Sequence, residues 1–143
     1  MLSLTCKTAV KAVIYLASKH QSGTNAGIKE IAEYIGASEH TVGKLLQTLV
    51  KNDVIKSAKG PTGGFYLSDG QLLQPVINIV YTIDGTEFFN ECGLGLRKCS
   101  ASQPCPIHHD YKKARDILEN LFKEKKVIHL CEPVSGGAAF LFI

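Results

Sequence analysis

The feature that most constrains the fold is a set of three amphipathic segments followed at once by a glycine-rich loop between two short β-type runs. Apolar residues recur at helical spacing in the three segments, which predicts helices over residues 8–19, 28–35 and 38–50. Gly36 ends the second helix, because glycine tolerates a positive φ, and Ser38 is the predicted N-cap of the third. The two β-type runs, 54–57 and 65–67, predict a hairpin with an extended tip.

The rest of the chain predicts a helical protein with one long loop. Leu73–Ile83 is predicted as a fourth helix with Pro75 in its first turn, and His108–Lys126 as a long amphipathic helix. Residues 84–107 have little periodicity, and the tail 131–143 is not assigned. The predicted fold is therefore mainly α with a small β-hairpin wing: a winged helix-turn-helix domain over residues 1–83, a cysteine-containing sensor loop over 84–107, and a dimerisation helix and tail over 108–143.

Charge and the absence of certain motifs narrow the class of protein. The 143-residue chain has a formal net charge of +3, which is compatible with a nucleic-acid partner without requiring one. No stretch has the length of a bilayer span or the pattern of a signal peptide, so we expect a cytoplasmic protein with no membrane partner. No catalytic triad or phosphate loop is present, so we expect no enzymatic activity.

The third helix and the hairpin form the predicted DNA-reading unit. The major groove admits an α-helix, whose N-terminal residues reach the base edges. The hairpin tip suits a minor-groove or phosphate contact, although the same pattern also occurs in helical bundles with an inert turn. The predicted DNA-binding residues are Ser38, Glu39, His40, Thr41, Lys44, Lys51, Lys59, Gly60, Gly63 and Gly64, with Lys56 extending the basic surface.

Three of the five cysteines lie within fourteen residues, at the spacing C-x6-C-x5-C. These are Cys92, Cys99 and Cys105. The spacing matches neither the paired knuckles of a zinc ribbon nor the ferredoxin patterns. Soft thiolates favour an iron–sulfur cluster or zinc over magnesium or calcium, so spacing alone predicts a thiolate-rich site of unspecified metal.

The chain resembles the bacterial regulators that include the iron–sulfur cluster regulator IscR and the nitric-oxide-sensing repressor NsrR. The resemblance covers about residues 4–126 and is carried by Ile31-Ala32, Gly36-Ala37-Ser38, Leu45-Leu46, Leu49 and the wing Lys59-Gly60-Pro61-Thr62-Gly63-Gly64-Phe65-Tyr66-Leu67. It implies a homodimer joined by the long C-terminal helix, a palindromic operator in double-stranded DNA, and a cluster held by the three loop cysteines. The chain has Lys59 where the family usually has arginine, and Gly43 where IscR has an acidic base-reading residue, so the operator sequence does not transfer.

The resemblance also indicates a fourth ligand. IscR has a histidine three residues after its third cysteine, and His108 stands at that position here. NsrR-type proteins use a carboxylate from the partner's first helix, where this chain offers no acid; His109 and Cys6 remain rivals to His108. The predicted cofactor is an iron–sulfur cluster, either 2Fe-2S or 4Fe-4S, that senses redox state, cluster status or nitric oxide. The alternatives are a thiol- or zinc-based regulator of the same fold and, more distantly, a small redox protein or metal carrier.

Overall fold

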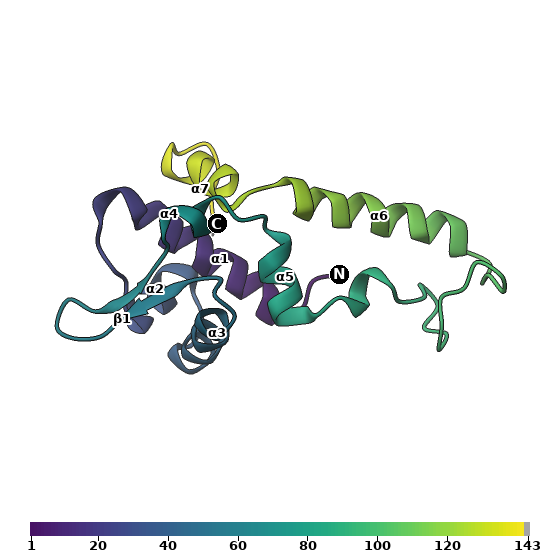
Figure 1. Cartoon of the computed structure of the whole chain (residues 1–143), viewed down its shortest axis with the longest axis horizontal. Coiled ribbons are helices and arrows are strands. Elements are labelled where there is room, and N and C mark those ends of the chain that lie inside the picture. Colours follow the sequence, from purple (N-terminus) through teal and green to yellow (C-terminus); the bar gives the residue numbers. More distant parts are fainter. Residues whose placement is uncertain (142–143) are drawn as a thin grey trace.

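The computed structural model describes residues 1–141 and is mainly helical, with one two-stranded hairpin in that range (Figure 1). In chain order the elements are α1 (Leu4–Lys19), the 3₁₀ helix η1 (His20–Ser22), α2 (Ile28–Ile35), α3 (Glu39–Lys51), β1 (Lys56–Ala58), β2 (Gly64–Tyr66), α4 (Asp69–Leu72), α5 (Ile77–Asp84), η2 (Glu87–Phe89), α6 (His108–Glu124) and α7 (Val127–Ser135). The predicted fold class, a winged helix-turn-helix domain with a long C-terminal helix, is confirmed.

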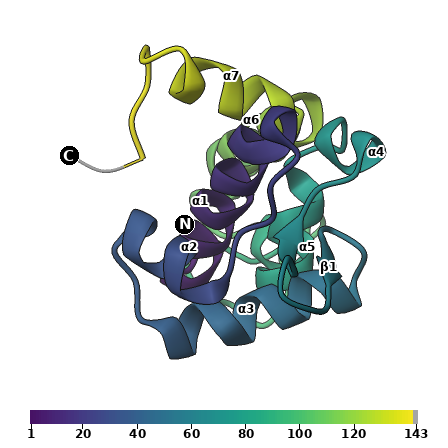
Figure 2. The same ribbon diagram turned by 90° about the vertical axis from the view of Figure 1, so that its left-hand side faces the viewer.

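Helix α1 is the centre of the main body, with α3, α5 and α7 packed around it (Figure 2). Most of its apolar residues from Cys6 to Ala17 are buried, and they meet apolar side chains from the other helices. The largest fully buried side chains include Leu16, Ile31, Leu46, Leu49, Ile55 and Ile79. Burying one such side chain contributes roughly 1.5–3 kcal/mol, so this core fixes the relative positions of α1, α2 and α3.

The wing is anchored on both sides. Strand β1 pairs antiparallel with β2, and Ala26 forms a bridge to the other edge of β2 through two hydrogen bonds with Phe65, at 3.0 and 2.8 Å. Gly64 adopts φ +137°, and a Cβ there would lie 2.8 Å from the Ala26 carbonyl oxygen. The close approach of these two backbone segments therefore requires glycine at this position.

Two helix predictions differ from the structure. The first helix begins at Leu4 rather than Thr8, because the Ser3 side chain accepts a hydrogen bond from the Cys6 amide and caps it. Of the predicted helix 73–83, residues 77–83 are helical, as part of α5, whereas residues 73–76, which include Pro75, separate α5 from the short helix α4. Ser68 and Gln71 form a capping box that begins α4, and Pro75 lies in a bridge to Lys126.

The C-terminal part contains one long helix and one short one. The predicted helix 108–126 is found as α6, which begins at His108 and extends beside α5 away from the main body (Figure 1). The first five residues of the unassigned tail, 131–135, belong to α7, and this helix packs on α1. Phe142 and Ile143 lie outside the described residues. Of the helices in residues 1–141, none combines the length and the apolar character needed to cross a membrane.

Candidate nucleic-acid interface and thiol-rich site

The helix-turn-helix geometry follows from the residues that join α2 to α3. Gly36 ends α2 in the left-handed conformation, at φ +68°. Ser38 then adopts an extended conformation, and its hydroxyl accepts a hydrogen bond from the Thr41 amide at 3.2 Å, which caps α3. The predicted turn and N-cap are therefore confirmed.

One side of α3 is buried and the other is open to solvent. Val42, Leu45, Leu46 and Leu49 pack into the core. The exposed residues of α3 and its N-cap include Ser38, Glu39, His40, Thr41, Lys44 and Lys51. Half-buried Gly43 faces α2, since a Cβ there would lie 3.4 Å from Ile28 Cδ1. The side of α3 that is open for contact is thus the side that carries the predicted DNA-binding residues.

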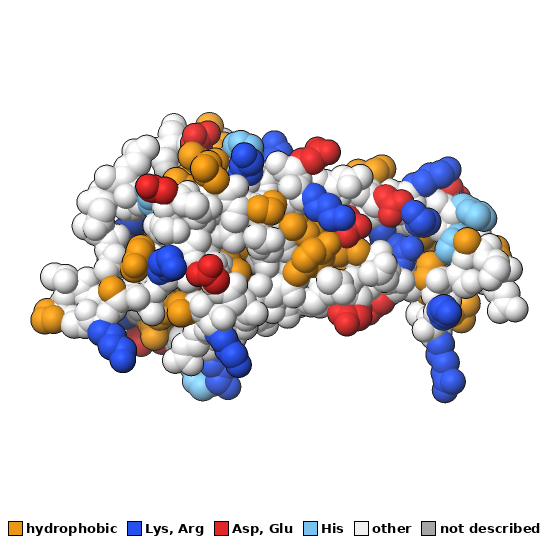
Figure 3. All heavy atoms as spheres, in the orientation of Figure 1, with side chains coloured by type: hydrophobic (Ala, Val, Ile, Leu, Met, Phe, Trp, Pro, Cys, Tyr) orange, Lys and Arg blue, Asp and Glu red, His pale blue; other side chains and the backbone are white. Residues whose placement is uncertain are grey.

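The wing tip adds a second polar surface beside α3. Lys59 and Gly60 are exposed, and the Gly63 amide donates a 2.9 Å hydrogen bond to the Gly60 carbonyl, which closes a tight turn. The Asn25 side chain donates to the Thr62 carbonyl at 3.1 Å, an anchor that the sequence analysis missed. In Figure 3, basic and histidine side chains project along the lower edge of the molecule, over α3 and the wing.

The thiol-rich loop lies at the opposite end of the molecule, where it leads into α6 (Figure 1). It brings its four predicted ligands together as two pairs. Cys92 Sγ lies 3.6 Å from Cys105 Sγ, and Cys99 Sγ lies 3.2 Å from Nδ1 of His108. His108 is the first residue of α6, where it is buried rather than solvated.

Backbone packing shapes the loop around Cys92. The Leu94 amide donates to Cys92 Sγ at 3.4 Å, and hydrogen bonds from the Leu94 and Leu96 amides lower the pKa of the Cys92 thiol. At Gly93 a Cβ would lie 2.7 Å from Tyr111 Cγ and 2.9 Å from Ile107 Cδ1, so the loop approaches α6 as closely as glycine allows. An open hollow of about 320 Å³ beside the loop is lined in part by Cys92 and Cys99.

Arg115, a buried residue of α6, also belongs to this site and was not predicted from the sequence. One guanidinium nitrogen, Nη1, donates to the Glu91 carbonyl, and Nη2 lies 3.5 Å from Cys99 Sγ. The guanidinium carbon is 5.5 Å from the centre of the Tyr111 ring. The available signal was its position seven residues after His108, which places both on one side of the helix.

The two remaining cysteines and His109 have other surroundings. Cys6 is fully buried in an apolar cluster with Ile77, Val80 and Phe89. Burial, with a smaller effect of Asp84, raises the pKa of the Cys6 thiol to about 12. His109 is exposed, with its ring centre 5.0 Å from that of His108. The structure therefore pairs His108, rather than its rivals Cys6 and His109, with a loop thiol.

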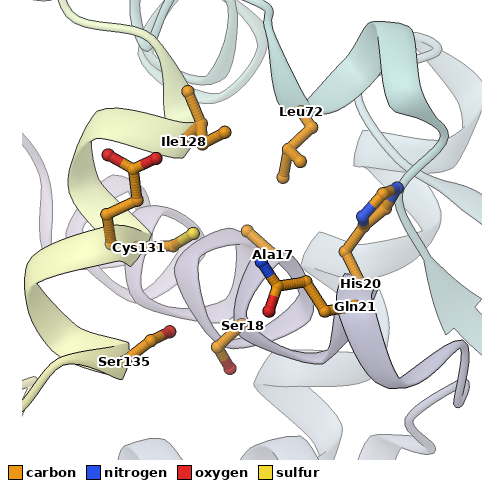
Figure 4. A pocket seen from close by; sticks show the side chains of 9 residues that line it. Ala17, Ser18, His20, Gln21, Leu72, Ile128, Cys131 and Ser135 are labelled. Atoms are coloured by element: carbon orange, nitrogen blue, oxygen red, sulfur yellow. The ribbon is translucent and has the colours of Figure 1, made fainter.

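Cys131 lies on α7, beside a hollow of about 210 Å³ between α1, α4 and α7, and Figure 4 shows its sulfur turned toward that hollow. Burial raises the pKa of the Cys131 thiol, and Glu132 adds to this effect. A neutral, buried thiol of this kind behaves as a small apolar side chain.

Comparison with known proteins agrees with the fold. Residues 2–133 match the family model Rrf2, described as an iron-dependent transcriptional regulator. A protein of Aquifex aeolicus (strain VF5), assigned by its name to the HTH-type transcriptional regulators, is 28% identical over 125 residues, which cover 86% of this chain and 85% of that protein.

Solved structures with the same fold include CymR, the global cysteine regulator of B. subtilis, with a TM-score of 0.76, 20% identity and coverage of 92% of this chain and 96% of that one. IscR of T. potens has a TM-score of 0.71 and 19% identity, with coverage of 98% and 92%. The oxidized form of Staphylococcus aureus CymR has a TM-score of 0.70 and 19% identity, with coverage of 92% and 96%.

These findings define the class of protein. A helix-turn-helix with a hairpin wing and a long C-terminal helix is the winged-helix architecture, and the matching family and relative are transcriptional regulators rather than enzymes. The chain belongs to the Rrf2 family of transcriptional regulators.

Proposed function

We propose that this protein is a homodimeric, sequence-specific DNA-binding regulator that senses redox state, cluster status or nitric oxide through an iron–sulfur cluster held by Cys92, Cys99, Cys105 and His108. The observation that carries the proposal is the arrangement of these four side chains as two close pairs of soft donors. DNA is read by α3 and the wing, through the exposed polar side chains of both.

The donor pairs fit a cluster with two irons. Two thiolates on one tetrahedral metal ion lie roughly 3.8 Å apart when each metal–sulfur bond is about 2.3 Å. Cys92 and Cys105, at 3.6 Å, meet this requirement, and Cys99 with His108 offers a second pair. We therefore expect each pair to bind one iron of a 2Fe-2S cluster.

When bound, such a cluster supplies a centre that gains or loses an electron and reacts with oxidants or nitric oxide. The chain's own residues determine how it is held. The Leu94 amide directs a hydrogen bond at the Cys92 sulfur, and Gly93 allows the loop to lie against Tyr111. Such N–H···S bonds favour the thiolate over the thiol and tune the potential of a cluster.

The unpartnered side of α6 supports the homodimer. His108 and Arg115 are the buried residues of this 17-residue helix, whereas Ile117 is 70% exposed and Leu121 is 47% exposed. A helix that projects from the body with large apolar side chains in water gains stability when a partner covers them. A second copy of α6 would cover them. The dimer would then place two DNA-reading units, each made of α3 and the wing, on successive half-sites about 34 Å apart.

Anaerobic purification, followed by iron and sulfide analysis and a visible spectrum, tests the cluster. We expect about two irons and two sulfides per chain, with charge-transfer bands in the visible range. Cys105→Ala should lose both, and the matched control Cys131→Ala, which removes a thiol outside the loop, should keep them. A colourless wild-type protein after anaerobic reconstitution with iron and sulfide would refute the cluster, and zinc in its place would establish the zinc-based alternative.

A thiol-based sensor is the second candidate, and the Cys92–Cys105 distance favours it. Two thiols whose sulfurs are 3.6 Å apart need little movement to form a disulfide. Oxidation by a peroxide would form the S–S bond, with the two protons and two electrons reducing the peroxide O–O bond. Mass spectrometry after peroxide treatment separates the candidates, since a reversible loss of two mass units in an iron-free protein that retains DNA binding supports the thiol sensor.

A further inference from the structure

Arg115 is a buried charge without a carboxylate partner. The side chain is 7% exposed, and none of the ion pairs within residues 1–141 includes it. An arginine side chain stays protonated, and burying it is costly unless a negative charge or a full set of hydrogen bonds compensates it. The position therefore requires an explanation beyond packing.

The surroundings of Arg115 indicate where its counter-charge lies. Nη1 donates to the Glu91 carbonyl and Nη2 points at Cys99 Sγ, 3.5 Å away. The buried Nε has no hydrogen-bond partner in the part of the chain that the structure describes. The guanidinium thus faces a sulfur ligand and retains an unused donor on its buried side.

We propose that Arg115 is the positioning residue and counter-charge of the thiolate centre, holding Cys99 in place and favouring the more negative state of a bound cluster. The inference rests on the proposed function, since thiolates bound to iron are deprotonated and carry the negative charge that would balance the Arg115 cation. Arg115 also ties this centre to the chain, because its Nη1 bond fixes Glu91 immediately before Cys92.

If Arg115 is the counter-charge, removing its charge alters the reduction potential of a bound cluster. If Arg115 only packs the loop, the potential stays unchanged. Arg115→Met removes the cation and keeps an apolar stem, while Arg115→Lys keeps the cation and loses the forked geometry. The matched control is Arg97→Met, because Arg97 is an exposed cation of the same loop, and its charge is screened by water.

The test measures the midpoint potential of the anaerobically reconstituted protein and the melting temperature of the metal-free protein. We expect Arg115→Met to lower the equilibrium constant for one-electron reduction of the cluster by about tenfold or more. This corresponds to a fall of about 59 mV in the midpoint potential. Arg115→Lys should retain most of the wild-type potential, and Arg97→Met should change the reduction equilibrium less than about twofold. The metal-free Arg115→Met protein should melt at the wild-type temperature or above it, because it no longer buries an uncompensated charge.

Three results overturn the inference. If the wild-type protein assembles a cluster and Arg115→Met leaves its midpoint unchanged, Arg115 is not the counter-charge and only this inference fails. If Arg115→Met lowers the melting temperature of the metal-free protein and Arg115→Lys does not restore the potential, the residue serves only the loop's packing. A wild-type protein that takes up no iron or sulfide refutes the proposed cluster itself, and this inference with it.

Discussion

Gly63→Ala tests whether the wing contacts DNA. A Cβ at position 63 would overlap the Ala58 carbonyl oxygen and would lie 2.8 Å from both the Gly60 oxygen and the Lys59 carbonyl carbon. All three are backbone atoms of the same turn, so the turn itself has to open. Overpacking of this kind typically costs about 1–3 kcal/mol when the turn is held in its wild-type form, and the free protein avoids most of this cost by opening the exposed turn.

The cost falls on the DNA complex more than on the fold. Residues 58–62 are exposed and contribute little to the core, so the free energy of unfolding should change by less than about 1 kcal/mol. A wing held out of position loses its backbone and Lys59 contacts with phosphates. Since about 1.4 kcal/mol corresponds to a factor of ten, we expect the affinity to fall by roughly tenfold or more.

The assay is fluorescence anisotropy at one fixed salt concentration, with a duplex recovered by the wild-type protein from a random-sequence pool. Gly70→Ala is the matched control, because no heavy atom lies within 4 Å of a Cβ at that exposed position in α4. The control should bind as the wild type does. If Gly63→Ala binds with the wild-type affinity and salt dependence, the wing is not part of the DNA interface.

Three further perturbations test the cap of α3, the dimer and an ion pair. Ser38→Ala removes the N-cap of α3 and should lower the free energy of unfolding by about 1 kcal/mol in urea titrations. Ile117→Asp should convert the dimer to a monomer in sedimentation experiments, while Lys112→Asp, elsewhere on α6, should not; an unchanged dimer would refute the proposed interface. The hydrogen bond from Lys19 lowers the pKa of Glu30 below its usual 4.5, with a smaller contribution from Tyr15. Glu30 therefore stabilises the fold fully above that pH and loses this effect as the pH falls through its lowered pKa. Lys19→Met removes the ion pair, so the free energy of unfolding should fall less steeply below about pH 4.5. Urea denaturation at several pH values measures this difference.

Local signals in the sequence suffice to predict the helix-turn-helix and its wing. The helical periodicity of α2 and α3, the glycine at the end of α2 and the serine cap of α3 each involve residues within one or two turns of one another. The hairpin is likewise set by the glycines of its tip and by its two β-type runs. These elements could be predicted because the interactions that determine them are short-range.

Long-range contacts explain what the sequence did not reveal. The break between α4 and α5 depends on hydrogen bonds to residues about fifty positions later, from the Val76 amide to the Lys125 carbonyl and from the Val127 amide to the Gln74 carbonyl, at 2.8 and 3.0 Å. The pairing of Cys92 with Cys105 and of Cys99 with His108 depends on how an irregular loop folds back on α6. The burial of Arg115 could not be predicted, because an arginine on an amphipathic helix ordinarily lies in solvent.

Similar long-range contacts link the junction of α6 and α7 to the segment between α3 and the wing. The Gln74 side chain donates to the Val54 carbonyl at 2.7 Å, just after α3, while its backbone carbonyl accepts from Val127 at the junction of α6 and α7. The buried Gln71 side chain donates to the Asp53 carbonyl at 2.9 Å. If the proposed sensor shifts α6, we expect these contacts to pass the movement to the backbone that joins α3 to the wing. Coupling through these part-buried hydrogen bonds requires that a bound cluster favour one of two positions of α6, because a ligand shifts an equilibrium only by its difference in affinity for the two states.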